Sequence, residues 1–416
     1  MSNLPRSPAL APFQVRSFRF QWPSDLAASW AFEMETLILG WYVLIETESV
    51  LLLTLFASLQ YIGTLLSPLF GVAGHRLGNK RVLCAMRAAY VTLAAVLMVL
   101  AFTDALQPLY VFIITALMGL VRPSDLVLRH ALIGETLPLN QFVGAASISR
   151  TTQDSARVMG ALSGAGLVAA LGTGPAYAVV VTFYVASLLL TLGVAGAPRS
   201  ADAMPAARPS AWHDLKEGLA YVWNRPPLLA AIWLALLVNL TAFPLVNGLL
   251  PYVARNIYGT DQTGLGYLVA GFAGGALLGS ILLTRFGHAV RPARMMIIGC
   301  VWWYVLTALF AQMESLTSGL PLLFLAGLAQ SLGMVAMSAM LLRSSGGRFR
   351  SRVMGIRMLV IYTLPIGLLA SGPLIGHFGF RAMATGYCLI GLLFTLLIAL
   401  RWRAHIWRTG AAANTQ

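Results

Sequence analysis

Two carboxylates lie in the middle of the first long apolar run of the chain, residues 24–46. Glu33 and Glu35 are two positions apart, so on an α-helix their side chains point about 200° from each other. Hydrocarbon disfavours the charged form of a carboxyl group, which suits a group that loads and releases a proton. Trp30 shares a face with Glu33, and this pair could bind a cationic or amphipathic molecule. We expect at least one acid to handle protons or substrate, with a static hydrogen-bonded role as the alternative.

A second set of charged residues lies in the fourth and fifth apolar runs. It consists of two trios, Arg122, Asp125 and Arg129 in one run and Arg150, Asp154 and Arg157 in the next. Each trio has the spacing of one helical face. If the two runs form antiparallel neighbours, a rise of about 1.5 Å per residue brings the trios to matching depths in the inner third of the membrane. We expect an inner gate whose ion pairs form and break, and the alternatives are direct proton or substrate handling and static stapling.

The composition requires these residues to lie on membrane-spanning helices. Of the 416 residues, 58% are hydrophobic and 10% are charged, and the mean hydropathy is +0.77. Soluble domains contain about 25% charged residues. The apolar runs cover residues 24–46, 50–71, 82–103, 107–132, 142–171 and 174–196, and then 227–250, 263–284, 294–313, 319–342, 354–375 and 382–400. The sequence therefore predicts an all-α membrane protein with twelve transmembrane helices in two six-helix bundles.

The runs also predict the domain organisation. We expect a cytoplasmic N-terminal segment (1–23), a first bundle (24–196), a cytoplasmic linker (197–226), a second bundle (227–400) and a cytoplasmic tail (401–416). Within the linker, Ala211 to Trp223 has the pattern of an amphipathic helix lying on the inner leaflet, because its aromatic and apolar residues recur at helical spacing.

The net charge of +14 comes from basic residues scattered through short loops, a pattern typical of membrane topology and not of a nucleic-acid partner. Their asymmetry predicts that both termini are cytoplasmic, in a multi-pass protein of the cell (inner or plasma) membrane whose partners are the lipid bilayer and a small-molecule substrate. We expect a monomer. The three cysteines are scattered and offer neither a disulfide framework nor metal spacing.

The segment from Gly71 to Leu83 reads GVAGHRLGNKRVL and connects the second and third runs. It resembles the loop between the second and third helices of the major facilitator superfamily, whose pattern is approximately G-x-L-A-D-R-x-G-R-K. The residues that carry the resemblance are Gly71, Arg76, Gly78, Lys80 and Arg81. His75 replaces the acid that is thought to latch this loop to the second half in relatives. Histidine could do so as a hydrogen-bond donor or at lower pH, and otherwise the arginines anchor the loop at the headgroups.

Small and neutral polar residues supply further candidates. Glycines at four-residue spacing, which let helices approach closely, occur at Gly160 and Gly164 and at Gly271, Gly275 and Gly279. They predict either tight packing alone or a seam on which the fifth and eighth helices slide. Pro244 and Pro365 predict kinks. In the second half, where buried acids are absent from the sequence pattern, Asn239 and Gln330 are the preferred cavity residues.

The strings ILGWYVLIETES around Trp41 and EGLAYVW at residues 217–223 resemble an exporter branch of the superfamily that includes macrolide-efflux and enterobactin-exporter-type proteins. This resemblance implies proton-driven efflux of a small amphipathic organic molecule by alternating access. Proton-coupled uptake and a non-transporting sensor are the alternatives. The sequence has no P-loop lysine motif, and we expect neither an enzyme nor a cofactor, with the proton gradient as the energy source.

Overall fold

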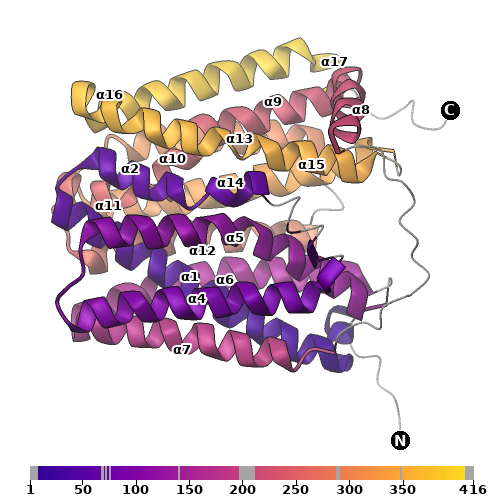
Figure 1. Cartoon of the computed structure of the whole chain (residues 1–416). Coiled ribbons are helices and arrows are strands. Elements are labelled where there is room, and N and C mark those ends of the chain that lie inside the picture. The colour runs from indigo at the N-terminus through magenta and orange to yellow at the C-terminus, as the bar shows by residue number, and fades with distance from the viewer. Residues whose placement is uncertain are drawn as a thin grey trace, which may run out of the picture. The chain divides into compact units, whose positions relative to one another are not determined.

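The computed structural model of the chain describes residues 8–66, 70, 73–74, 76–138, 141–195, 211–286, 291–346 and 349–407. Its first helices are η1 (Pro8–Gln14), α1 (Arg16–Thr47), α2 (Val50–Leu59), η2 (Ile62–Leu66), α4 (Asn79–Phe102), α5 (Pro108–Thr136), α6 (Phe142–Leu171) and α7 (Thr173–Leu192). The later ones are α8 (Ala211–Trp223), α9 (Pro226–Thr241), α10 (Phe243–Asn247), α11 (Leu250–Tyr252), η4 (Val253–Ile257), α12 (Gln262–Phe286), α13 (Pro292–Phe310), α14 (Leu316–Ser344), α15 (Arg350–Val360), α16 (Thr363–Arg401) and α17 (Arg403–Ile406). The described residues contain no strand (Figure 1), and the predicted all-α fold with twelve spans in two bundles is confirmed.

Seven helical stretches of the described residues are long and apolar enough to cross a bilayer on their own, and an eighth span results if the bent pair α8–α9 is counted as one. One of the seven, Arg352–Arg401, contains α15 and α16 together. α16 turns back on itself at Gly379, whose φ of 80° suits a residue without a Cβ (Figure 1). The remaining spans are interrupted or carry charges: α2 is short, α1 holds acids in mid-helix, and α6 holds an acid and arginines there. The protein is therefore a multi-pass membrane protein.

Both prolines at which kinks were predicted lie just after an interruption of a helix. α9 ends at Thr241 and α10 begins at Phe243, one residue before Pro244. α15 ends at Val360 and α16 begins at Thr363, so Pro365 also lies in the first turn of a new helix. A proline is tolerated there because the first backbone N–H groups of a helix have no partner within the helix.

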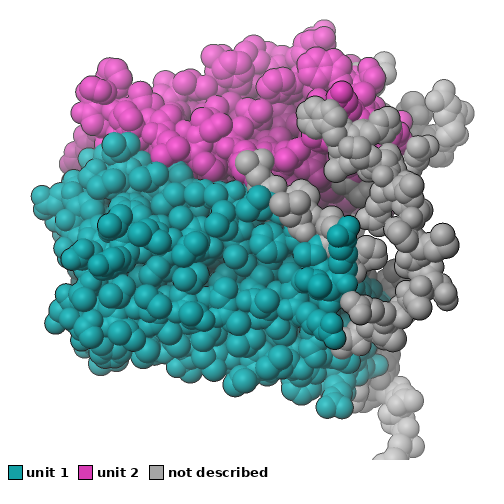
Figure 2. Space-filling view, in the orientation of Figure 1, with its two compact units in different colours: residues 1–202, 248–273 teal, residues 203–247, 274–416 magenta. Residues whose placement is uncertain are grey.

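Contacts divide the chain into two compact units, residues 1–202 with 248–273 and residues 203–247 with 274–416 (Figure 2). From the apolar runs we expected residues 227–400 to form the second bundle. The contacts instead assign residues 248–273 of this range to the first unit. Arg255 explains their place in the first unit: its guanidinium donates to the Leu44 carbonyl at 2.9 Å and pairs with Glu48 at 3.2 Å.

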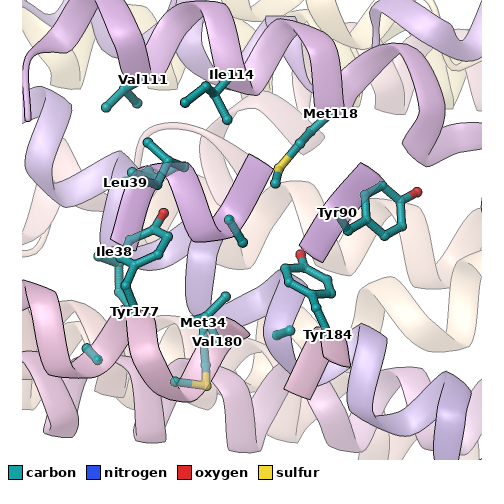
Figure 3. Close-up of a cluster of buried hydrophobic side chains, with 14 of the residues drawn as sticks. Met34, Ile38, Leu39, Tyr90, Val111, Ile114, Met118, Tyr177, Val180 and Tyr184 are labelled. Atoms are coloured by element: carbon teal, nitrogen blue, oxygen red, sulfur yellow. The ribbon is translucent and has the colours of Figure 1, made fainter. Parts of the chain in front are cut away.

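The first unit is packed around α1, which makes its most extensive contacts with α6 and α7. Its apolar core contains aliphatic and methionine side chains from α1, α4, α5 and α7 together with three tyrosines (Figure 3). These include Met34, Ile38, Tyr90, Met118, Tyr177 and Tyr184, all under a tenth exposed. Because α1 is covered on most sides, any polar group that it carries must be satisfied by a neighbouring helix.

Four charged side chains are buried between α1, α4 and α5: Asp25, Arg87, Asp125 and Arg129. Asp25 is ion-paired with Arg87 and lies 3.5 Å from Arg129. Asp125 is ion-paired with Arg129 and lies 3.8 Å from Arg87. Each acid therefore has two arginines as neighbours and each arginine two acids, so this four-charge cluster is neutral.

Hydroxyl groups complete the four-charge cluster. Arg87 donates to Ser24 on α1 and to Thr191 on α7. Arg129 donates to Ser29 at 2.9 Å, and the Gln21 amide donates to the Arg129 carbonyl at 3.0 Å. The cluster thereby connects α1 to α4, α5 and α7, and it fixes the height and rotation of α1 within the first unit.

Arg87→Leu should destabilise the protein by about 3–5 kcal/mol, because removing one partner of a buried ion pair leaves an uncompensated charge. Thermal unfolding of the purified protein in detergent measures this. Arg150→Gln is the matched control: Arg150 pairs with Asp154 at 3.2 Å but is 52% exposed, so its loss should cost under about 1 kcal/mol. Asp25→Asn combined with Arg87→Leu should recover part of the loss, and a double variant that is no more stable than Arg87→Leu would contradict this account.

The second unit depends on close helix approach at glycine. A Cβ atom at Gly275 of α12 would lie 1.8 Å from the Phe324 carbonyl oxygen of α14, whereas one at Gly274 would have its nearest neighbour at 3.6 Å. Gly275→Ala should therefore destabilise the protein by about 1–3 kcal/mol through overpacking, and Gly274→Ala should not. The same melting assay compares the two variants, and equal melting temperatures would show that α12 and α14 can separate without cost.

Candidate functional site

Glu35 lies at the centre of a polar site inside the first unit. Its side chain is 2% exposed, and its Oε2 accepts a hydrogen bond from the Tyr184 hydroxyl at 2.9 Å. Arg122 of α5 reaches the same oxygen at 3.3 Å and also approaches the Tyr184 hydroxyl at 3.4 Å. Three helices, α1, α5 and α7, thus contribute one group each to this Glu35 site.

Arg122 is held from two further directions. Its guanidinium carbon lies 3.0 Å from the centroid of the Phe32 ring, which is cation–π geometry. Its Nη1 is 3.5 Å from Gln60 Oε1, to which Thr36 also donates at 3.3 Å. A planar guanidinium can make these contacts at once, which an ammonium group cannot. The second carboxylate oxygen of Glu35, Oε1, has no hydrogen-bond partner among the described residues.

Glu33 points to a different helix. A Cβ atom at Gly160 of α6 would lie 2.6 Å from the Glu33 Cβ, so the two backbones meet there. The half-buried Glu33 side chain interacts electrostatically with two arginines, more strongly with Arg157 than with Arg122. The expected divergence of the two acids on α1 therefore holds: Glu35 faces α5 and α7, and Glu33 faces α6.

Trp30, like Glu33, faces α6. Its indole N–H donates to Ser163 at 2.8 Å, and its ring stacks on Phe183 with the centroids 5.2 Å apart. Trp30 is thus packed against α6 and α7, with the ring edge committed to a hydrogen bond.

The described ion pairs of the two charged trios lie within each helix or lead to α1 and α4. Asp125 pairs with Arg129 on its own helix and approaches Arg87 on α4, and Asp154 pairs with Arg150 on its own helix. Arg122 turns to Glu35 on α1. α5 shares few contacts with α6, whereas α1 contacts both helices and carries the acids Asp25 and Glu35 that lie near arginines of α5.

Sequence reasoning missed Asp25, Arg87 and Tyr184. Asp25 and Arg87 each lie inside an expected span, so the rule that an intramembrane charge needs a partner already applied to them. Tyr184 had no distinguishing signal, because a tyrosine in an apolar run has the same pattern as a core aromatic residue.

The cytoplasmic loop motif is described only in part, since Gly71 and His75 lie outside the described residues. Gly78 precedes α4 with a φ of 97°, a conformation that favours glycine. Lys80 donates to the Leu192 carbonyl at the end of α7 at 2.8 Å, while the Arg76 and Arg81 side chains are exposed. The described part of the loop is therefore tied to the end of α7.

The glycine candidates lie at close helix contacts. Gly160 and Gly164 pack against Glu33 and Met34 of α1. Gly275 and Gly279 pack against α14, at Phe324 and Leu328. Gly271 lies in the same helix, α12, one turn before Gly275. The approach of α6 to α12 within the first unit occurs at another glycine: a Cβ atom at Gly266 would lie 2.5 Å from that of Ala165.

The two neutral candidates of the second unit are both buried at 6% exposure. Asn239 on α9 donates its amide to the Ala235 carbonyl of its own helix at 2.8 Å. Gln330 lies in the middle of α14.

Solved structures with the same fold are transporters. A mutant of the nucleoside transporter NupG has a TM-score of 0.71 at 14% identity, covering 93% of this chain and 99% of that chain. An inward-facing, unoccupied bacterial homolog of the human lysosomal transporter Spinster has a TM-score of 0.68 at 13% identity, covering 92% and 96%. The human organic anion transporter TETRAN has a TM-score of 0.67 at 14% identity, covering 92% and 99%. Identities this low show the fold alone.

No curated protein sequence matches this chain. The family model described as transmembrane secretion effector matches residues 7–412, which is nearly the whole length. The chain therefore belongs to this family of the major facilitator superfamily, and it is a secondary transporter of the membrane.

Proposed function

We propose that this protein is a proton-coupled exporter of small amphipathic organic cations that works by alternating access. The observation that carries the proposal is Glu35, a carboxylate buried in an apolar bundle and held by Arg122 and Tyr184. Its charge depends on one arginine and one hydroxyl, so adding a proton removes the attraction to Arg122 and frees the guanidinium. A group of this kind can convert proton binding into movement of a helix.

Glu33 is the acid that we assign to the substrate. It is half-buried, lies beside the glycine at position 160, and shares its face with the aromatic ring of Trp30. A carboxylate beside an aromatic ring attracts a positively charged, partly apolar molecule. In the second unit, Asn239 and Gln330 are the neutral polar groups that we propose for the same substrate.

Export is favoured over uptake by the family description, transmembrane secretion effector, and by the resemblance to macrolide-efflux and enterobactin-exporter-type proteins. The arginine-rich loops favour a protein of the cell membrane whose two termini lie in the cytoplasm. We also propose that Arg150, Asp154 and Arg157 form the inner gate, since Arg150 is exposed while Asp154 is buried. The proton gradient supplies the energy, the protein works as a monomer, and it requires no cofactor.

Glu35→Gln should abolish proton-driven transport, because the amide can neither load a proton nor attract Arg122 as a charge. The measurement is ethidium uptake by inside-out membrane vesicles with an acid interior, where the unaltered exporter accumulates the dye as protons leave. Ethidium exchange without a gradient should persist in Glu35→Gln, since the amide resembles the protonated acid. Glu46→Gln, at the exposed end of the same helix, is the control and should transport normally.

Three outcomes of the vesicle assay would count against the proposal. Release of preloaded ethidium from vesicles with an acid interior would indicate uptake symport. No movement with either sign of the gradient would indicate a sensor. Full proton-driven accumulation by Glu35→Gln would place the proton site elsewhere.

Glu33→Gln should lower the affinity of the protein for its substrate. Losing an interaction with a charged group costs about 1.5–3 kcal/mol, so the KM for ethidium should rise about tenfold or more while the maximal rate changes little. Initial rates in the same vesicles, with Glu46→Gln again as the control, separate the two parameters. If Glu33→Gln keeps its KM and loses its maximal rate, Glu33 and not Glu35 is the acid that exchanges the proton.

A further inference from the structure

The linker helix α8 lies across the end of a membrane span. Its residues Leu215–Trp223 make an angle of 109° with Pro226–Thr241 of α9. Since α9 crosses the bilayer, α8 lies near the plane of the membrane surface. The helix predicted over Ala211–Trp223 is observed with the same bounds.

One face of α8 is fastened to α15 within the second unit. Glu217 pairs with Arg352 at 2.8 Å, and Tyr221 stacks on Phe349 with the ring centroids 4.1 Å apart. The Tyr221 hydroxyl accepts the Gly346 N–H at 3.0 Å. A Cβ atom at Gly218 would lie 3.2 Å from that of Arg352, so the glycine permits the close approach of the two helices. α8 therefore has a fixed orientation, with Gly218 and Val222 buried.

The opposite face of α8 is apolar and exposed. Leu219 is 51% exposed and Trp223 is 64% exposed, and both are one or two turns from Lys216, which is exposed as well. The spacing of these three residues, i, i+3 and i+7, places them on one side of the helix. A leucine, a tryptophan beside a span and a lysine are the residue types of a helix that lies in the headgroup region.

The surroundings of α8 are basic. The segments 211–225 and 343–360 contain seven Lys or Arg residues and two acids, Asp214 and Glu217. The Glu217 charge is compensated by Arg352, while Arg225, Arg343 and Arg350 are exposed. Basic residues at a membrane surface attract anionic lipids, at about 1 kcal/mol each.

We propose that the face formed by Lys216, Leu219 and Trp223, together with Arg225, Arg343 and Arg350, is a binding surface for an anionic lipid leaflet. The apolar side chains enter the headgroup region and the basic groups contact lipid phosphates. Because α8 is fastened to α15, the leaflet also holds the helix that leads into α16.

Spin labels on the full chain test this surface. Cys84, Cys300 and Cys388 are replaced by alanine, and a label is attached at Leu219→Cys or, in the exposed turn that follows α8, at Asn224→Cys. The protein is reconstituted in vesicles of phosphatidylethanolamine and phosphatidylglycerol, or of phosphatidylcholine alone. Collisions with oxygen, which dissolves in lipid, and with a water-soluble nickel chelate report the depth of each label. Trp223→Cys provides a second label if Leu219→Cys does not fold.

The label at Leu219 should collide mainly with oxygen in vesicles that contain phosphatidylglycerol, and less so in phosphatidylcholine. The label at Asn224 should collide mainly with the chelate in both. Lys216→Gln with Arg225→Gln should weaken the preference for phosphatidylglycerol about fivefold per charge removed, the equivalent of about 1 kcal/mol. Arg381→Gln is the control. Arg381 pairs with Glu314 near the start of α14, at the end of that helix away from Arg343, so its loss should leave the preference for phosphatidylglycerol unchanged.

Two results would overturn the proposal. If the label at Leu219 meets the chelate as readily as the label at Asn224 in every vesicle, the face is in water. If it is shielded from both reagents and couples magnetically to a second label, a second copy of the chain covers it. An equal depth in both lipid mixtures would likewise remove the anionic selectivity on which the proposal depends.

Discussion

The first unit depends on the pairing of Asp25, Arg87, Asp125 and Arg129. In lipid, the hydrophobic effect does not hold one helix against another, so packing and polar contacts decide how helices assemble. A charge in this medium must find its opposite, and here four charges on three helices satisfy one another with hydroxyl groups from α7. The cluster therefore selects one arrangement of α1, α4 and α5, because any rotation of α1 would leave an arginine or an aspartate without a partner.

The position of α1 in turn determines what its two glutamates can do. Two residues apart on a helix with neighbours on both sides, they meet different helices. Arg122 and Tyr184 are the polar contacts of Glu35, and Tyr184 belongs to the core of tyrosines and methionines that Figure 3 shows. Glu33 meets the glycine face of α6, where the absence of a side chain at Gly160 leaves room for the acid. One helix thus carries two carboxylates with separate surroundings.

Much of the fold could be predicted from the sequence because lipid leaves few choices. Long apolar runs must be helices, prolines such as Pro244 and Pro365 break them, and an amphipathic segment such as Ala211–Trp223 must lie at a surface. Which helix faces which could not be predicted in this way. The spacing of Arg122, Asp125 and Arg129 predicts one helical face, but depth along a helix axis does not show which helix lies next to that face. The contacts of Arg122 with α1 and of Asp125 with α4 could therefore not be predicted. The glycines had the same ambiguity: Gly160 and Gly275 mark close contacts, and the sequence does not say with which helix.

The number of arginines around each acid distinguishes Asp25 and Asp125 from Glu35, the acid at which we propose proton exchange. Asp25 and Asp125 each have two arginines as neighbours, and the four charges balance one another. Protonating either acid would leave the four-charge cluster with an excess positive charge in a medium that penalises it. Glu35 has one arginine, a tyrosine hydroxyl and an oxygen without a hydrogen-bond partner among the described residues. In the transport cycle that we propose, the guanidinium released by protonation of Glu35 still has the Phe32 ring and the Gln60 amide oxygen as neighbours. Arg122 thus keeps neighbours in both charge states that we propose for Glu35, whereas a proton on Asp25 or Asp125 would unbalance the neutral four-charge cluster, and this difference is why we propose proton exchange at Glu35 and not at the aspartates.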